Sequence, residues 1–214
     1  MPPVRAPDQT QSGQGTASSA SPRMFDNWVL DKLSRTHHLT PIVVYLPVVT
    51  AMFWLGGSRL SWPLLPAGAL AGYILWTLVE YFGHRFLFHW QMRGRFGARF
   101  HFMIHGVHHD HPSDPLRLVM SLLMSAPIMV MAALALRLIC GPDLVLPVLA
   151  GFIAGYVGYD ALHYHFHHRE PRSAVGRAFK RWHMLHHFRD ATTRFGVSAP
   201  WWDAVFGTMP IKSS

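Results

Sequence analysis

The sequence predicts an all-α integral membrane protein in which four transmembrane helices form two hairpins. Half of the 214 residues are hydrophobic and only 14% are charged, a composition typical of membrane proteins. Four uncharged stretches have close to the length that a helix needs to cross a bilayer. Nearly all of the Lys and Arg residues fall on one side of the topology that these stretches define.

The chain before these stretches divides into two parts. Residues 1–23 are rich in Pro, Ser, Gly, Gln and Thr and have no apolar run, which predicts a disordered tail and not a signal peptide. In residues 24–36 apolar side chains recur at helical spacing, which predicts a short interfacial helix on the membrane surface. A linker without regular structure is the alternative. The recurring residues are Phe25, Trp28, Val29 and Leu33.

Residues 37–214 are predicted to form a single membrane domain that contains the four spans. The spans cover residues 39–58, 60–79, 118–136 and 144–159. Very short connections join the first span to the second and the third to the fourth, so we expect two hairpins. Proline inside three of the spans is compatible with membrane helices, which tolerate it with local kinks.

The distribution of basic residues predicts the orientation of these hairpins. With four crossings, the N-terminal tail, residues 80–117 and residues 160–214 share one side of the membrane. Seventeen of the nineteen Lys and Arg residues lie on that side, and only Arg59 and Arg137 lie in the opposite loops. Both termini are therefore predicted to be cytoplasmic. The same distribution explains the net charge of +8 without a nucleic-acid partner, because no block of Lys and Arg is present.

Ten of the sixteen histidines form four clusters, and all four fall on the predicted cytoplasmic side. Imidazole is a common ligand for zinc, iron, copper and nickel. Ten imidazoles exceed what one ion can hold, so we expect two ions with about five ligands each and a position left open for chemistry. The single Cys140 excludes a disulfide framework and a Cys-based metal site. The clusters are His84 and His89; His105, His108 and His109; His163 and His167; and His183, His186 and His187.

The spacing within three clusters suits one face of a helix. Positions i, i+3 and i+4 project together, as in both H-x-x-H-H triplets and in the pair His163 and His167. His84 and His89 are five positions apart, about 140° on an ideal helix, so they serve different metals or sit across a bend near Gly83. The other six histidines are expected to be ordinary interfacial polar groups: His37, His38, His101, His111, His165 and His168.

Two carboxylates are candidates for orienting the ring nitrogens that do not bind metal. Asp160 precedes His163 by about one helical turn, and Glu80 precedes His84 by four positions. Both lie at the end of an apolar run, where an unpaired charge is costly. We therefore expect them in the second layer around the metals.

Four segments resemble the fatty acid hydroxylase superfamily, and within it the fatty acid (sphingolipid) 2-hydroxylase branch. The resemblance covers about residues 60–208. The order H-x4-H, H-x2-HH, H-x3-H, H-x2-HH is specific to that branch, whereas the similar sterol desaturase branch has a shorter first pair. The segments are HRFLFH (84–89), HFMIHGVHHDHPSDPLR (101–117), YDALHYHFHH (159–168) and KRWHMLHHFRDATTRFGVSAPWWDAVFGT (180–208).

The resemblance implies a membrane anchor capped by a cytosolic helical domain, built from residues 80–117 and 160–214, that holds a dinuclear site. The ten clustered histidines would bind two iron ions, with no catalytic residues beyond these ligands. Zinc can replace iron during overproduction but has no redox chemistry. The implied reaction is O2-dependent hydroxylation of a fatty acyl or ceramide-type lipid at carbon 2.

The resemblance also bears on partners and localisation. Residues 1–23 are too short for a cytochrome b5 domain, so electrons are expected from a separate cytochrome b5-like or ferredoxin-type protein. This favours the inner membrane of a bacterium, with the endoplasmic reticulum as the alternative in a eukaryote. The lipid is expected to enter from the bilayer along an aromatic groove, although an interfacial aromatic belt is an equal interpretation. The groove candidates are Trp182, Phe195, Trp201, Trp202 and Phe206.

Three other functions compete with this hypothesis. A related di-iron hydroxylase or desaturase could act on a sterol, a carotenoid or an ornithine lipid, and product analysis separates these. A b-type haem protein would need histidine pairs inside the spans, and none of the four spans contains histidine. A divalent-metal transporter would need polar ligands at mid-membrane depth, which the spans lack.

Overall fold

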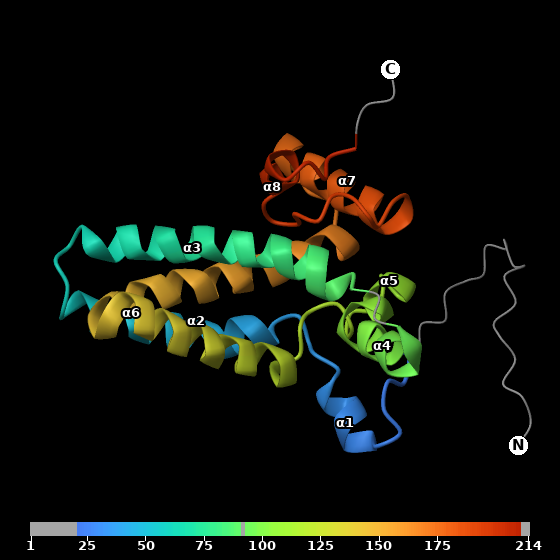
Figure 1. Ribbon diagram of the computed structural model, residues 1–214, viewed down its shortest axis with the longest axis horizontal. Coiled ribbons are helices and arrows are strands. Elements are labelled where there is room, and N and C mark those ends of the chain that lie inside the picture. The colour runs from blue at the N-terminus through green and yellow to red at the C-terminus, as the bar shows by residue number, and fades with distance from the viewer. Residues whose placement is uncertain (1–20, 91–92, 211–214) are drawn as a thin grey trace, which may run out of the picture.

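The structure, a computed structural model, describes residues 21–90 and 93–210, and every regular element in this part of the chain is a helix (Figure 1). The predicted tail of residues 1–23 lies almost entirely outside the described residues. The elements are α1 (Trp28–Leu33), α2 (Thr40–Gly57), α3 (Leu64–Phe82), η1 (Gly83–Phe88), α4 (Gly94–His101), η2 (Phe102–Gly106), α5 (Val107–Asp110), α6 (Leu122–His168), α7 (Ala174–Phe188) and α8 (Trp201–Val205).

Among the described residues, three helices are long and apolar enough to cross a membrane: α2, α3 together with η1, and α6. The first two predicted spans coincide with α2 and α3. The third and fourth, residues 118–136 and 144–159, both fall within α6, and residues 118–121 precede its start. The four predicted spans therefore correspond to three helices, the last of which is sharply bent.

A sharp break at Gly141 divides α6 into the two halves that the sequence predicted as separate spans. Gly141 has a φ of 77° and a ψ of −177°, a conformation that is open to glycine because it has no Cβ. Pro142 follows and cannot donate the backbone hydrogen bond that would continue the helix. In Figure 1 the two halves of α6 diverge from this break and run back toward the end of the molecule that carries α4, α5 and α7.

Helices α3 and α6 pack so closely that their backbones are in contact. A Cβ added to Gly72 would lie 1.8 Å from the carbonyl oxygen of Val148, and one added to Gly151 would lie 1.9 Å from that of Ala69. Small residues at such crossings let helix backbones pack closely where the surrounding solvent is lipid. A buried hydrogen bond of 2.9 Å between the hydroxyls of Tyr45 and Ser125 joins α2 to α6.

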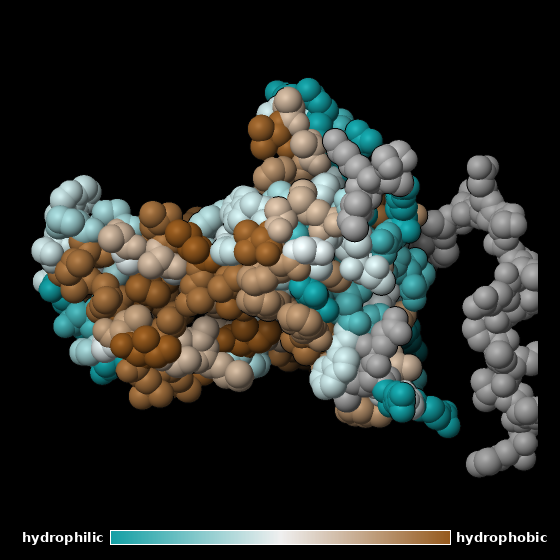
Figure 2. All heavy atoms as spheres, turned by 45° about the horizontal axis from the view of Figure 1, so that its top comes forward, coloured by the Kyte–Doolittle hydropathy of each residue, from teal (hydrophilic) through white to brown (hydrophobic). Residues whose placement is uncertain are grey.

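The outer surface of these helices is apolar. Leu138, Trp54 and Ile139 are each at least 79% exposed, and Figure 2 shows hydrophobic side chains over the long helices, with most hydrophilic ones at the end that carries the short helices. A continuous apolar surface of this kind indicates contact with another apolar phase. The short helices and the loops around α7 form the polar end.

The predicted interfacial helix of residues 24–36 is helical only from Trp28 to Leu33, and it is attached to the rest of the chain by a buried ion pair. Asn27 caps the helix by accepting from the Val29 and Leu30 backbone amides. Asp31 bonds Arg117 at 2.9 Å. Trp28 and Leu33 stay 69% and 51% exposed, so one side of α1 is tethered and the other is free to lie on a membrane.

Candidate metal centre

The ten clustered histidines converge into two groups of five. In each group one ring nitrogen from every histidine lies within 4.8 Å of those of the others. The first group comprises His84, His89, His105, His109 and His186, and the second comprises His108, His163, His167, His183 and His187. Histidines up to about a hundred residues apart in sequence thus meet at the polar ends of the long helices. None of the six remaining histidines belongs to either group.

A π-helical turn brings His84 and His89 into the same group. Residues 83–88 form the π-helix η1, and the His89 amide donates to the His84 carbonyl at 3.2 Å, an i to i+5 bond. Five residues therefore make about one turn, and the two Nε2 atoms lie 3.2 Å apart. Of the two interpretations of their spacing, different metals or a bend near Gly83, the geometry follows the second. π-Turns of this kind occur frequently at functional sites.

Each H-x-x-H-H triplet contributes to both groups. In the first triplet His105 and His109 belong to the first group and His108 to the second; in the other triplet His186 belongs to the first group. The rings of His109 and His187 stack at 4.1 Å across the boundary between the groups. The two groups are therefore neighbours, which is the arrangement expected of a dinuclear site.

The hydrogen bonds of the first group fit a bound cation. His84 Nδ1 donates to the Phe195 carbonyl oxygen at 2.6 Å, and His186 Nδ1 donates to the Thr193 carbonyl oxygen at 2.7 Å, because a carbonyl oxygen can only accept. Both Nε2 atoms consequently carry lone pairs. They lie 3.2 and 3.0 Å from His89 Nε2, and a metal ion is the partner that several converging lone pairs have in common.

The second group shows the same convergence of ring nitrogens. His167 Nε2 lies 2.9 Å from His183 Nε2, and His108 Nε2 lies 3.1 Å from His187 Nε2. Both nitrogens of His163 are buried without a hydrogen-bond partner in the described part of the chain. An all-imidazole set suits zinc, iron, copper or nickel better than a hard cation.

Burial keeps these imidazoles neutral. It lowers the pKa of His105, His108 and His183 well below the ordinary histidine value, and the neighbouring histidines lower each pKa further. For His89 and His109 burial followed by the neighbouring histidines lowers the pKa to about 3. Neutral imidazole is the form that binds metal, so the ligand set is ready at neutral pH.

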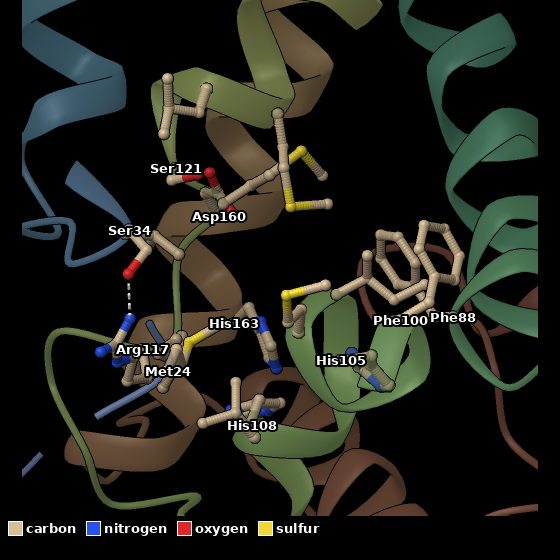
Figure 3. A pocket seen from close by; sticks show the side chains of 18 of the residues that line it. Met24, Ser34, Phe88, Phe100, His105, His108, Arg117, Ser121, Asp160 and His163 are labelled. Atoms are coloured by element: carbon tan, nitrogen blue, oxygen red, sulfur yellow. Dashed lines mark hydrogen bonds between the residues drawn. The ribbon is translucent and has the colours of Figure 1, made fainter. Parts of the chain in front are cut away.

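A partly open cavity of about 240 Å³ borders both groups. His105 of the first group, with His108 and His163 of the second, line one part of it (Figure 3). Most of its remaining wall is apolar, and Asp160 is an acidic residue in that wall. The apolar wall includes Met24, Phe88, Phe100, Ile104, Val107, Leu118 and Met124.

Neither predicted second-layer carboxylate bonds a histidine directly. Both oxygens of Asp160 are buried without a partner in the described residues and border the cavity. Glu80 accepts from the Val197 and Ser198 amides at 2.9 and 2.8 Å, so it holds the loop that contacts His84. The sequence did not predict a role for Asp203, which follows two tryptophans. Asp203 holds the same loop by accepting from the Phe195 and Gly196 amides, and its position after the last histidine gave no indication of this.

The five groove candidates do not line the cavity. Phe195 packs edge-on against His84 at 5.7 Å, and Phe206 stacks on Tyr81 at 5.1 Å. The indole N–H groups of Trp182 and Trp202 donate to Asp203 and Thr77. Trp201 is 48% exposed. The cavity is instead enclosed mainly by η2, α6, residues 117–121 and the segments that flank α1, and not by α8.

The fold and the site together define an all-helical protein with membrane-length apolar helices and a histidine-rich centre at their polar ends. Comparisons with known proteins agree with this class. The model of the fatty acid hydroxylase family matches residues 69–208. A solved structure described as full-length scs7p, with only its hydroxylase domain visible, superposes with a TM-score of 0.83 at 30% identity, covering 89% of this chain and 72% of that one.

Curated relatives give the same result. A dihydroceramide fatty acyl 2-hydroxylase of Arabidopsis thaliana is 36% identical over 88% of this chain and 80% of its own length. A ceramide very long chain fatty acid hydroxylase of Schizosaccharomyces pombe is 35% identical over 94% of this chain and 58% of its own length. The fatty acid 2-hydroxylase of Homo sapiens is 30% identical over 87% and 56%. The chain belongs to the fatty acid hydroxylase family, in its 2-hydroxylase branch, and is a hydroxylase.

Proposed function

We propose that this protein hydroxylates carbon 2 of a lipid acyl chain, in a free fatty acid, an acyl thioester or a ceramide-type lipid, with O2 as co-substrate. The observation that carries the proposal is the placement of two five-histidine groups against one apolar cavity. The names of the relatives support the acyl substrate over a sterol, a carotenoid or an ornithine lipid.

The ten histidines are the proposed metal ligands, five for each of two iron ions. The bound iron would supply the O2 activation and redox chemistry that zinc cannot supply. The histidines would hold the ions in place, and the apolar wall would exclude water, which limits side reactions. Electrons are proposed to come from a separate cytochrome b5-like or ferredoxin-type protein.

The cavity is the proposed position of the acyl chain near its carboxyl end. Phe88, Phe100 and Ile104 offer an apolar surface beside His105. Asp160 borders the same cavity, and neither of its carboxylate oxygens has a hydrogen-bond partner among the described residues. A buried carboxylate without a partner is costly, so we propose that Asp160 accepts a hydrogen bond from a substrate donor, such as the amide N–H of a ceramide-type lipid. That contact would orient carbon 2 toward the histidines.

Features of the same structure support the proposed membrane arrangement. The apolar surfaces of α2, α3 and both halves of α6 cross the bilayer, and the histidine groups, α4, α5 and α7 lie on the cytoplasmic side with the exposed arginines. The exposed side of α1, with Trp28 and Leu33, rests on the membrane surface beside the cavity.

The test is lipid analysis in a host that makes no 2-hydroxy lipids. The chain is expressed with an electron-donor system, an iron supply and a source of ceramide, beside the His183→Ala His187→Ala variant and an Asp143→Asn control at the far, exposed end of the fold. Acyl chains with one added oxygen at carbon 2, present with the parent and control and absent with the histidine variant, are expected. Oxygen placed elsewhere, or no oxidised lipid under these conditions, would overturn the proposal.

A further inference from the structure

The loop of residues 193–198 runs between two buried carboxylates and contacts two of the proposed metal ligands. Asp203 in α8 and Glu80 in α3 are 0% and 5% exposed. Neither is paired with a Lys or Arg in the described residues, since all four ion pairs found there involve other acids. The two carboxylates accept hydrogen bonds only from neutral groups in the described residues, and most of these donors belong to this loop.

Asp203 fixes the first part of the loop. Its Oδ1 accepts from the Phe195 amide at 2.8 Å and from the Thr208 hydroxyl at 2.6 Å. Its Oδ2 accepts from the Gly196 amide at 2.9 Å and from the Trp182 indole at 3.3 Å. Hydrogen bonds to a charged acceptor are stronger than neutral ones, and four of them hold the carboxylate and the loop in a single relative position.

Glu80 fixes the end of the loop. One carboxylate oxygen accepts from the Val197 and Ser198 amides, and the other accepts from the Ser198 hydroxyl. Four consecutive backbone amides, those of residues 195–198, therefore donate to two buried carboxylates. The loop has no regular secondary structure of its own, so these side chains replace the backbone hydrogen bonds that a helix would provide.

The fixed loop presents two carbonyl groups to the first histidine group. The Thr193 and Phe195 carbonyls accept from His186 and His84. Arg194 lies between them with a φ of 63°, the sole non-glycine residue with positive φ in the described residues. A non-glycine residue costs about 1 kcal/mol or more in this conformation. Its presence between the two carbonyls indicates a backbone shape that the surrounding contacts impose.

The second histidine group has no equivalent support. The Nδ1 atoms of four of its members are buried without a hydrogen-bond partner in the part of the chain that the structure describes: His108, His163, His183 and His187. The loop and its two carboxylates thus act on one group only. The ring orientation of the second group depends on packing alone, for example the His109–His187 stack.

We propose that Asp203 and Glu80 are positioning residues for one of the two metal ions, acting through the 193–198 loop on His84 and His186. This inference rests on the proposed metal centre. It implies that the two ions are not equivalent: the first group is preorganised by the loop, and the second is not. Losing a hydrogen-bond partner of a ligating histidine lowers metal affinity about 10- to 100-fold, and here the loss falls on one ion.

The experiment titrates the metal-free, purified full chain with Co²⁺, following visible absorption, and measures bound cobalt after equilibrium dialysis. The parent is expected to bind two ions per chain. Asp203→Asn keeps the shape of the side chain but turns one hydrogen-bond acceptor into a donor. It should lower the affinity for one of the two ions about 10- to 100-fold and leave the affinity for the other unchanged. His89→Ala should abolish the same binding step, and His167→Ala the other. Asp143→Asn is the matched control at an exposed site.

Milder variants guard against misfolding of Asp203→Asn. Ser198→Ala removes a single bond to Glu80, and Gly196→Ala adds a Cβ that would lie 2.4 Å from the Ala199 carbonyl oxygen and so shifts the loop without removing a hydrogen-bonding group. Both variants should lower the affinity for the same ion whose binding His89→Ala abolishes. The inference would be overturned if variants that elute like the folded parent showed an equal loss of affinity for both ions, or no loss for either. A parent chain that binds no metal would instead overturn the proposed metal centre.

Discussion

His84 and His89 face one another with their Nε2 atoms 3.2 Å apart, although five positions separate them on one helical segment. The π-turn of η1 makes this possible. An α-helical register would place them about 140° apart. The geometry of the first histidine group therefore depends on a local departure from the α-helix, and the first prediction concerns it.

Inserting one alanine after Phe86 should separate the two histidines. Six positions fit neither an α-turn nor a π-turn, so His89 would leave the first group. We expect hydroxylation to fall by at least about 100-fold, the upper range for disturbing a ligand's surroundings, and bound metal to fall from two ions to one. An alanine inserted after Ser61, in the loop between α2 and α3, is the control. Retention of both ions would contradict the role of the π-turn.

Metal retention should decrease on acidification. In the folded chain burial and neighbouring histidines hold the pKa of His89 and His109 at about 3, against about 6.5 in an unfolded chain. The unfolded chain therefore binds more protons below pH 6.5, so the stability that the neutral groups contribute is present above 6.5 and is lost as the pH falls toward 3. The melting temperature and metal content at pH 7.5, 6 and 5 measure this. A melting temperature that stays constant from pH 7.5 down to pH 5 would argue against buried, neutral imidazoles.

Replacing Asp31 by alanine should release α1, and with it the flanking residues that line the cavity. Arg117 is 1% exposed as a side chain and would be left without its 2.9 Å partner, a loss of about 3 kcal/mol for a broken buried pair. Met24 would leave the cavity wall with the helix. Protease cleavage within residues 24–36 should accelerate, and hydroxylation should decrease. The Asp31→Ala Arg117→Met variant should recover part of the stability, whereas unchanged proteolysis of Asp31→Ala would refute the tether.

The ion pair also has a pH signature of its own. Burial raises the pKa of Asp31, but hydrogen bonds from the Met24 amide, Arg35 and Arg117 outweigh it and lower the pKa to about 2. Asp31 therefore stabilises α1 above its unfolded pKa of about 3.9, and this contribution disappears only as the pH falls toward 2. The imidazole contribution begins to fall below pH 6.5, whereas the contribution of Asp31 is complete down to about pH 3.9, so the two losses should begin at different pH values.

Asp160→Asn should separate substrate binding from metal binding. Asp160 borders the cavity but bonds no histidine. We therefore expect two metal ions per chain in this variant and a KM for the lipid raised about tenfold or more, the effect of about 1.4 kcal/mol. Metal analysis and lipid kinetics on the same sample test this. A variant that lost metal, with unchanged KM in the remaining active fraction, would assign Asp160 to the metal centre instead.

Gly151→Ala should destabilise the helical core strongly. The added Cβ would lie 1.9 Å from the Ala69 carbonyl oxygen, so α3 and α6 would have to separate. A loss of about 3 kcal/mol, the upper range for overpacking, should appear as a lower melting temperature and reduced yield. Gly158→Ala in the same helix is the matched control, because nothing lies within 4 Å of its added Cβ. Equal melting temperatures for the two variants would exclude the close crossing.

The sequence by itself determined the helical class, the approximate limits of the long helices and the histidines that converge. These features depend on composition and on periodicities of three to four residues, which local chemistry enforces. The sequence did not determine how the histidines divide. His105 and His108 lie on one short segment but enter different groups, because that choice depends on how η2, α6 and α7 meet.

Only the tertiary structure decided the remaining features of the site. The π-turn at Gly83–Phe88 resolved the ambiguous spacing of His84 and His89. The sequence alone could not, because it is compatible with either an α-helical or a π-helical turn. The cavity wall came mainly from η2, α6 and the segments that flank α1, and not from the aromatic residues near α8. Asp203 acquired a role because its carboxylate reaches the amides of a loop that bonds His84 and His186. Such contacts join residues distant in sequence, and no local pattern encodes them.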